Sequence, residues 1–335
     1  MIHSYRIPLA RRRRLVAGAV ALASLAAVPI ASAQEWPAGK PITIIVPFTA
    51  GGNVDTTARL IAQKLGERLR QSVVVDNVPG AGGVIGAGKA VQAAPDGRTL
   101  LMGFEGPIAI AKSINPAAVK FDPATDLVPV ALTTNAPMVI VAKPELPVAT
   151  IDDLIALARK QPGKLGYATS GIGTVLHLAM EIAKERAGIQ IEHVPYKGGA
   201  QIATDVMGNH VDLAVLVSTS VIPHVTSGKL KALAVTTAKR LPALPSVPAL
   251  AESKGFEGFD IGTWTGLFAP AKTPPALVER INAEVNAVLA LDEIRKRLAE
   301  GGATAGSGDA ASFAAFVKRE QAQFAQVIAR AGIKE

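Results

Sequence analysis

Cysteine is absent from the 335-residue sequence, and this absence excludes several kinds of chemistry. No disulfide, thiolate metal site or cysteine nucleophile can form. A lipid anchor attached to a cysteine behind an export signal is excluded for the same reason. Aromatic residues make up only 4% of the chain and do not interleave with basic runs, so the sequence offers no base-stacking platform. We therefore expect no nucleic-acid partner.

The motifs of several enzyme and cofactor classes are also missing. The sequence has neither a phosphate-binding Gly-Lys-Ser/Thr nor a His-Glu-x-x-His zinc motif. Ser170 does not lie in a Gly-x-Ser-x-Gly nucleophile elbow, because residue 168 is alanine. The glycine cluster 80–88 lacks dinucleotide-binding spacing, because Ile85 and Val91 stand where a third glycine would fall. We expect no cofactor and no metal, and we interpret the cluster as a structural turn.

The first 33 residues have the three parts of a secretory signal peptide. Residues 11–14 are four arginines, 15–30 form an apolar stretch, and 31–33 read Ala-Ser-Ala, a small-residue cleavage site. The apolar stretch is shorter than the roughly 20 residues that span a bilayer. We therefore expect 1–33 to be removed and the mature protein to lie in the periplasm, with general secretion and twin-arginine export both open.

Most of the net charge belongs to that leader. The whole chain has 35 Lys+Arg against 27 Asp+Glu, and residues 1–33 contain five arginines and no acid. The remaining 30 basic and 27 acidic residues leave a charge of +3, which favours anionic ligands only weakly.

The chain behind the leader predicts two α/β lobes. Single hydrophobic cores stop growing near about 250–300 residues, and strand-like runs alternate with helical patterns, which is typical of parallel sheets. Long apolar runs at 128–141 and 259–270 predict two strands that cross between the lobes. We expect lobe one at 35–136 plus 260–335 and lobe two at 137–259, with a ligand cleft between them.

Two strand–loop–helix stretches carry the strongest functional pattern. The first covers residues 41–65 with a loop at 47–55, and the second covers 164–187 with a loop at 169–174. The start of a helix presents unpaired N–H groups and the positive end of the helix dipole, so each loop is a candidate anion site. We expect the two loops to face each other across the cleft and to hold a carboxylate.

The side chains beside these loops have more than one interpretation. Asp55 either accepts from the first-turn amides of its helix, which we favour, or contacts ligand. His177 donates to ligand, supports its neighbours or fills the core, and the last two are favoured. Lys197, next to Tyr196, either counters a second carboxylate or is solvated. Glu105, which follows a predicted strand, receives an ammonium group in the cleft or has no role.

Seven motifs, in order along the chain, carry a family resemblance. They are PFxxGGxxDxxAR from residue 47, PGAGG from 79, PDGxTL from 95, SGxGTxxHL from 170, HVPYKG from 193, GKLKALAV from 228 and LPxVP from 244. Together they resemble the substrate-binding proteins of tripartite tricarboxylate transporters, the Bug or TctC-like family.

The resemblance implies a non-enzymatic receptor with a bilobal periplasmic-binding-protein-like (Venus flytrap) fold. Such a receptor closes on a dicarboxylate, a tricarboxylate, an acidic amino acid or a related carboxylate. It delivers this ligand to a permease of one large and one small integral-membrane subunit, and we expect it to be a monomer. The positions that carry over to the ligand site are Phe48, Thr49, Gly51, Gly52, Thr169, Ser170, Gly171, Gly173, Thr174 and His177.

Three positions depart from the family pattern. Thr49 adds a hydroxyl group, Ile172 makes the second loop more apolar, and Ser246 lies in a proline-rich loop away from the ligand site. We expect ligand selectivity to depend on side chains beside the glycines, namely Thr49, Glu105, Ile172, Tyr196 and Lys197.

Two other functions remain open. A ligand sensor that passes its closed form to a histidine kinase would have the same sequence features. An exported hydrolase or isomerase on the same scaffold is the weaker alternative, because the sequence shows no evident nucleophile, metal motif or oriented base.

Overall fold

The computed structural model describes residues 36, 37 and 39–331. The predicted signal peptide lies outside these residues. The chain divides into two units, Met1–Ala38 and Gly39–Glu335, and the description below concerns the second unit. Within the described part of the chain, no helix is long and apolar enough to span a membrane.

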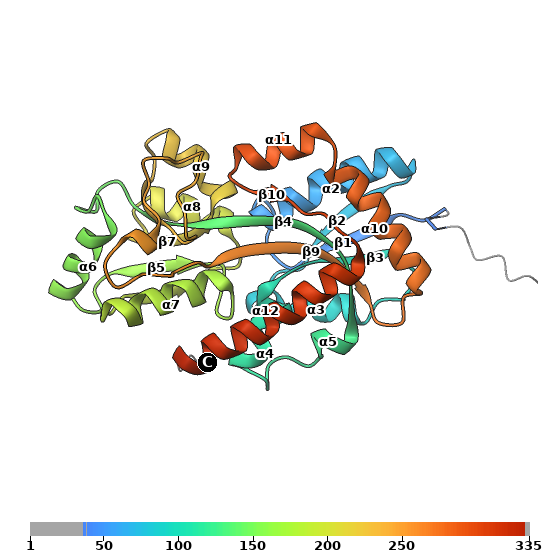
Figure 1. Ribbon diagram of the computed structural model, residues 1–335, viewed down its shortest axis with the longest axis horizontal. Coiled ribbons are helices and arrows are strands. Elements are labelled where there is room, and N and C mark those ends of the chain that lie inside the picture. Colours follow the sequence, from blue (N-terminus) through green and yellow to red (C-terminus); the bar gives the residue numbers. More distant parts are fainter. Residues whose placement is uncertain (1–35, 38, 332–335) are drawn as a thin grey trace, which may run out of the picture. The chain divides into compact units, whose positions relative to one another are not determined.

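A single mixed sheet runs through the second unit, with the strand order β2-β1-β3-β9-β4-β7-β5-β6 (Figure 1). Two further strands, β8 and β10, pair with β4. The strands are β1 (Ile42–Val46), β2 (Val73–Asn77), β3 (Thr99–Phe104), β4 (Leu127–Ala142), β5 (Gly166–Thr169), β6 (Glu192–Pro195), β7 (Leu213–Val217), β8 (Lys231–Val235), β9 (Gly262–Pro270) and β10 (Thr304–Ala305).

Strand β4 belongs to both halves of this sheet. It pairs with β9 from Leu127 to Pro137 and with β7 and β8 from Met138 to Ala142. On one side β1 pairs in parallel with β2 and β3, which defines lobe one. On the other side β5 pairs in parallel with β6 and β7, which defines lobe two. Two α/β lobes joined by two crossing strands, β4 and β9, are therefore confirmed, whereas the exact lobe boundaries stay a prediction.

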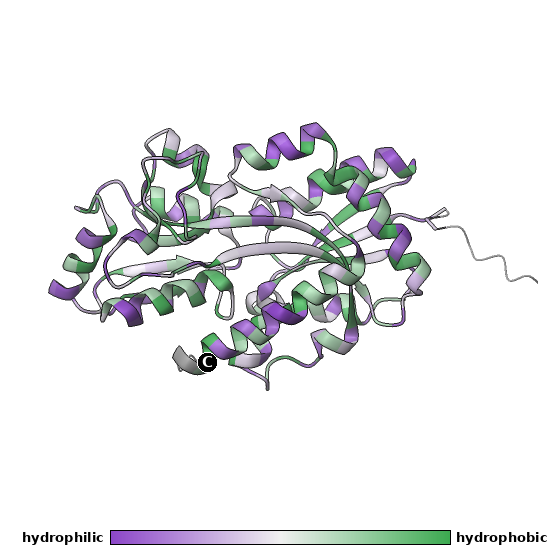
Figure 2. Ribbon diagram, viewed as in Figure 1, coloured by the Kyte–Doolittle hydropathy of each residue, from purple (hydrophilic) through white to green (hydrophobic). Residues whose placement is uncertain are grey.

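Helices surround both halves of the sheet, and in Figure 2 they carry hydrophilic and hydrophobic residues together, as amphipathic surface helices do. The helices are α2 (Asn53–Leu69), α3 (Val84–Val91), α4 (Ala111–Ile114), α5 (Pro123–Asp126), α6 (Ile151–Lys160), α7 (Val175–Ala187), α8 (Gly199–Met207), α9 (Ser218–Thr226), α10 (Pro275–Leu289), α11 (Asp292–Glu300) and α12 (Ala310–Ala331). Short turns of other helix types are η1 (Ala81–Gly83), η2 (Gly106–Ile110) and η3 (Leu250–Glu252).

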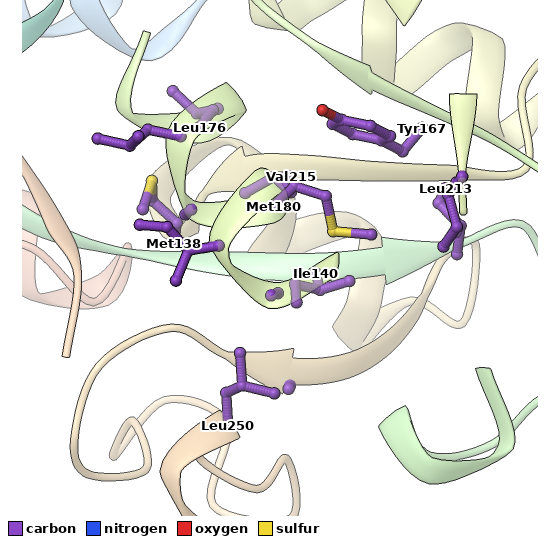
Figure 3. Close-up of a cluster of buried hydrophobic side chains, with 14 of the residues drawn as sticks. Met138, Ile140, Tyr167, Leu176, Met180, Leu213, Val215 and Leu250 are labelled. Atoms are coloured by element: carbon purple, nitrogen blue, oxygen red, sulfur yellow. The ribbon is translucent and has the colours of Figure 1, made fainter. Parts of the chain in front are cut away.

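The core of lobe two has a layer on each face of the sheet. Because successive strand residues point to opposite faces, Ile140 and Val215 join one buried cluster, whereas Val139 and Leu216 join the other. Figure 3 shows side chains of the first cluster converging from β4, β7 and α7. Burial on both faces requires an apolar strand, and β7 and the lobe-two part of β4, from Met138 to Ala142, meet that requirement.

The glycine cluster 80–88 contains the structural turn that the sequence predicted. Gly80, Gly82 and Gly83 have φ angles of 134°, 56° and 99°, and α3 begins only at Val84. Positive φ angles are incompatible with an α-helix, so these glycines form the turn η1 instead. The short elements η2, α4, α5 and β10 had no counterpart in the prediction.

Candidate functional site

The loop between β1 and α2 is held in shape by Asp55. The carboxylate accepts hydrogen bonds from the N–H of Gly51, from Nδ2 of Asn77 and from Nε of Arg59, each at 2.9 Å. The guanidinium of Arg59 also donates to Oδ1 of Asn77, at 2.9 Å. Burial opposes ionisation of Asp55, but the hydrogen bonds from Arg59, Gly51 and Asn77 outweigh it and hold the pKa below its usual value.

We favoured Asp55 as an acceptor for the first-turn amides of α2, and this expectation is wrong about the donor. The donor is the Gly51 N–H, which lies one residue before the N-cap of α2, and not an amide of the first helical turn. Asp55 is only 2% exposed, and both carboxylate oxygens accept from protein donors. Its position is that of a support beneath the loop.

The loop between β5 and α7 is also shaped by buried polar side chains. Thr174 caps α7: its hydroxyl donates to the carbonyl of Gly171 at 2.8 Å and accepts from the N–H of His177 at 3.4 Å. Thr169 shares a hydrogen bond of 2.7 Å with Nε2 of His193. Since the first turn of α7 carries no acidic residue, its dipole is not offset by a local carboxylate.

His177 lies in a polar column beneath that loop. Its ring stacks on His193 with centroids 4.4 Å apart, and its Nε2 lies 3.9 Å from Oε1 of Glu181. Tyr167 donates to the same glutamate, and Lys184 lies 2.7 Å from it. Burial, followed by the charge of His177, lowers the pKa of His193 to about 4, so His193 is neutral at physiological pH. This arrangement matches the supporting role among the three interpretations of His177, and the pairing with His193 had not been foreseen.

Each of the two loops meets a different segment of the opposite lobe. In loop 47–55, the N–H of Thr49 donates to the carbonyl of Lys197 at 3.3 Å, and a Cβ placed on Gly51 would lie 3.4 Å from that of Ala200. In loop 169–174, Gly171 lies against the turn η1, where a Cβ placed on Gly171 would be 3.3 Å from Cα of Gly82. Across the lobe boundary, loop 47–55 thus lies next to the β6–α8 turn, and loop 169–174 lies next to η1.

Two glycines permit these close contacts. A Cβ on Gly82 would collide with the carbonyl oxygen of Ile172, and a Cβ on Gly198 would collide with the hydroxyl of Thr49. Gly82 needs glycine most, because backbone of the opposite lobe occupies the space and its φ is 56°, whereas at Gly198 the obstacle is a side-chain hydroxyl.

A cavity of about 330 Å³, here called the interlobe cavity, opens beside these contacts. Lobe one contributes η1 and α4 with the segment that follows it, and lobe two contributes loop 169–174 and the end of β6. Of the described residues that line it, none is acidic and Lys197 is basic. Apolar side chains, including Ile114, Val119 and the exposed Ile172, form much of its wall. This composition suits an anion with an apolar body.

The predicted site residues divide into two groups. Gly171, Gly173, Tyr196 and Lys197 line the interlobe cavity. Tyr196 donates its hydroxyl to Asp205 at 2.7 Å, and burial together with that bond raises its pKa to about 12, so it offers a ring to the cavity and not a free hydroxyl. The predicted residues that do not line it are Phe48, Thr49, Gly51, Gly52, Asp55, Thr169, Ser170, Thr174 and His177.

Glu105 lies apart from the interlobe cavity, contrary to its expected place in the cleft. It is fully buried, and its carboxylate accepts from the hydroxyl of Thr263 at 2.8 Å and from the N–H of Trp264 at 3.1 Å. Burial raises its pKa to about 8, although these hydrogen bonds act in the opposite direction. Glu105 thus ties the end of β3 to the crossing strand β9.

The sequence-based reasoning missed the lobe-one wall of the cavity. Residues 111–119 and Ala81 line it, but the prediction assigned no element to the segment between residues 104 and 127. The available signal was weak, because four-residue helices are too short to show a helical period.

Two α/β lobes on crossing strands, with a cavity lined by both, define the fold of a periplasmic binding protein. Within that class, the chain belongs to the tripartite tricarboxylate transporter family of receptors, whose family model (TctC) matches residues 57–333. The family resemblance carried by the sequence motifs is thereby confirmed.

Related proteins span nearly the whole chain. Protein BugT of Bordetella pertussis is 35% identical over 316 residues, which are 94% of this chain and 95% of that protein. The structure of R. palustris Rpa4515 with adipate is 36% identical, covers 90% of this chain and 99% of its own, and has a TM-score of 0.86. MatC from Rhodopseudomonas palustris with bound malate is 30% identical, covers 88% and 100%, and has a TM-score of 0.83. The family and these neighbours are receptors and binding proteins.

Proposed function

We propose that this protein is a periplasmic receptor that binds a small carboxylate in the interlobe cavity and delivers it to a tripartite tricarboxylate transporter permease of one large and one small subunit. The observation that carries the proposal is the composition of that cavity: Lys197 and the glycine-rich loop before α7, with no acid among the described lining residues. The adipate- and malate-bound relatives support a carboxylate as ligand.

The binding mechanism is closure of the two lobes around the ligand. In the open form the loop amides are hydrated, and a carboxylate replaces that water. Each charge-assisted hydrogen bond contributes about 1.5–3 kcal/mol, but only contacts made in the closed form shift the lobe equilibrium. We propose that Gly171 and Gly173, which line the cavity, contact the carboxylate, and that Thr169, Thr174 and His177 hold their loop as Asp55 holds the first loop. The other family positions, Phe48, Thr49, Gly51, Gly52 and Ser170, are proposed to reach the ligand on closure.

The cavity wall narrows the ligand class. Lys197 is exposed at one end, and Ile114, Val119 and Ile172 offer apolar surface. We propose that Lys197 pairs with a carboxylate and that the apolar wall receives an aliphatic or aromatic body. A compact, hydroxyl-rich tricarboxylate would leave the apolar side chains of that wall exposed to water. We therefore expect it to bind more weakly than a carboxylate with an extended apolar body.

Calorimetry and thermal melting with malate, adipate, citrate, glutamate and benzoate test this proposal. We expect at least one to bind and to stabilise the protein by about 2.7 kcal/mol when present at 100 times its dissociation constant. Lys197→Gln should weaken that ligand about tenfold, whereas Lys229→Gln, an exposed lysine of lobe two away from the cavity, should not. A panel in which no carboxylate binds, or equal effects of the two lysine variants, would refute the site.

Uptake measurements test the delivery step. Cells that lack this protein should lose high-affinity uptake of the ligand identified above and regain it with the wild-type chain. If uptake is unchanged but a transcriptional response to the ligand disappears, the receptor acts as a sensor and not in transport.

A further inference from the structure

A second and larger cavity, of about 400 Å³, lies at the crossing strands and is here called the hinge cavity. Its walls come from β4, β9, β10 and α12 and also from lobe two, through Leu178 and Thr237. None of the described residues lines both this cavity and the interlobe cavity. The hinge cavity is therefore a separate space, and the proposed carboxylate site leaves it without a role.

The chemistry of the hinge cavity is opposite to that of the interlobe cavity. Its described lining contains two acids, Glu320 and Asp260, and no basic side chain. Three aromatic residues, Trp264, Phe316 and Phe324, contribute to the wall. Aromatic faces and carboxylates both attract cations and do not attract anions.

Trp264 couples Glu320 to a second, fully buried carboxyl group. Its indole N–H donates to Oε2 of Glu320 at 3.0 Å, and its backbone N–H donates to Oε2 of Glu105 at 3.1 Å. Burial raises the pKa of both groups, and the charge of Glu320 raises that of Glu105 further. The basic group that offsets Glu320 is Arg319, whose guanidinium lies over the ring of Phe316, 5.9 Å from its centroid, and outside the cavity lining. Glu105 is thus held in its protonated form at neutral pH, and Glu320 is the acid beside the cavity whose ionised form an ammonium group would stabilise, with no basic side chain among the described lining residues.

We propose that the hinge cavity binds a small organic monocation, an amine or ammonium with an apolar body, whose charge pairs with Glu320 and whose body packs on Phe316 and Trp264. Such a cation would gain a charge-assisted contact with the carboxylate and a cation–π contact with an aromatic face. Because Leu178 and Thr237 of lobe two complete the wall, the bound cation would touch both lobes across the crossing strands.

Tryptophan fluorescence provides a direct test. The chain has two tryptophans, so Trp36→Phe leaves Trp264, in the cavity wall, as the single reporter. We expect benzylammonium to change its emission saturably. Benzyl alcohol, which has a similar shape without the charge, should bind at least about tenfold more weakly, a difference of about 1.4 kcal/mol.

Variants then assign the effect to the cavity. Glu320→Gln keeps an oxygen for the indole N–H and removes the charge, so it should weaken benzylammonium about tenfold and leave benzyl alcohol unchanged. Glu279→Gln, which removes an equal charge on the exposed side of α10, should have no effect. Phe316→Leu should weaken both compounds and keeps the test valid if Glu320→Gln does not fold. The proposal is wrong if benzylammonium gives no saturable signal, if both compounds bind equally, or if the two glutamate variants behave alike.

Discussion

At the scale of single residues, the site depends on side chains that hold loops in place. Asp55 is the example, because one buried carboxylate accepts hydrogen bonds from Gly51, Asn77 and Arg59. Each of these donors belongs to a different segment: the loop before α2, the end of β2 and the second turn of α2. The conformation of the first loop is thus set by an ionised group that does not line the cavity.

Asp55→Ala should destabilise the protein strongly. It leaves the half-exposed Arg59, the half-buried Asn77 and the N–H of the exposed Gly51 without their acceptor, so we expect the free energy of unfolding to fall by about 1–3 kcal/mol. Urea denaturation of both proteins measures this loss. The matched control is Glu185→Ala, an exposed acid on α7 that should cost less than about 0.5 kcal/mol. A loss for Asp55→Ala no larger than that of the control would contradict the assigned role.

Glu105 should make stability depend on pH in a defined direction. Its pKa is raised to about 8 in the folded protein from an ordinary value of 4.5, so folding favours the protonated form. Its contribution is complete below pH 4.5 and is lost as the pH rises through about 8, at up to about 1.4 kcal/mol per pH unit. His193, with its pKa lowered from 6.5 to about 4, acts in the opposite direction only below pH 6.5.

The pH window from 6.5 to 8 therefore isolates Glu105 from His193. Urea denaturation across this window should show stability falling with pH in the wild type. The slope should be shallower in Glu105→Gln, which keeps a hydrogen-bond acceptor and loses the titration. Equal slopes in the two proteins would mean that Glu105 is not protonated in the folded state.

The sequence identified the important residues better than it identified their partners. Asp55, Glu105 and His177 were all singled out, yet the structure gives each a contact that spacing along the chain could not supply. Glu105 bonds to Trp264, 159 positions away, and His177 stacks on His193. A single sequence reveals period and position along an element, but the neighbour across a sheet depends on strand order.

At the scale of elements, prediction succeeded where a period was long enough to be seen. The crossing strands at 128–141 and 259–270 correspond to β4 and β9, since an apolar run of this length is conspicuous. The segment between β3 and β4 was missed, because η2, α4 and α5 have five, four and four residues. That segment supplies much of the lobe-one wall of the interlobe cavity. Because its short helices were not predicted, the residues of this wall were not predicted either.

The turn η1 should control lobe closure. A Cβ on Gly82 would collide with the Ile172 carbonyl of lobe two, so Gly82→Ala should weaken carboxylate binding at least about tenfold, or 1.4 kcal/mol. The control is Gly188→Ala at the end of α7: its φ of 61° resembles the 56° of Gly82, but nothing lies within 4 Å of an added Cβ. Both variants carry the same backbone strain, about 1–2 kcal/mol, so thermal melting should be similar and calorimetry should separate them. Equal ligand affinities would show that η1 does not limit closure.

At the scale of the whole molecule, the proposed mechanism is a change in the distance between lobes. Small-angle X-ray scattering should show a smaller radius of gyration when the carboxylate found by calorimetry is added, since contacts made only in the closed form shift the equilibrium toward it. Gly82→Ala should remain expanded at the same ligand concentration. An unchanged scattering curve at saturating ligand would show that binding and closure are not linked.

The continuity of β4 also restricts how this receptor can be recombined with its relatives. This one unbroken strand belongs to the sheet of both lobes. Its pairing partner is β9 up to Pro137, and its partners are β7 and β8 from Met138 onward. Neither lobe can therefore be exchanged by cutting the chain at a surface linker, because the boundary between the lobes falls inside a strand. A chimaera that grafts the second lobe of an adipate-binding relative onto this chain needs its first splice inside β4, where strand partners change, and its second before β9. Ligand specificity in this scaffold should accordingly have diversified through loop replacement more readily than through exchange of whole lobes.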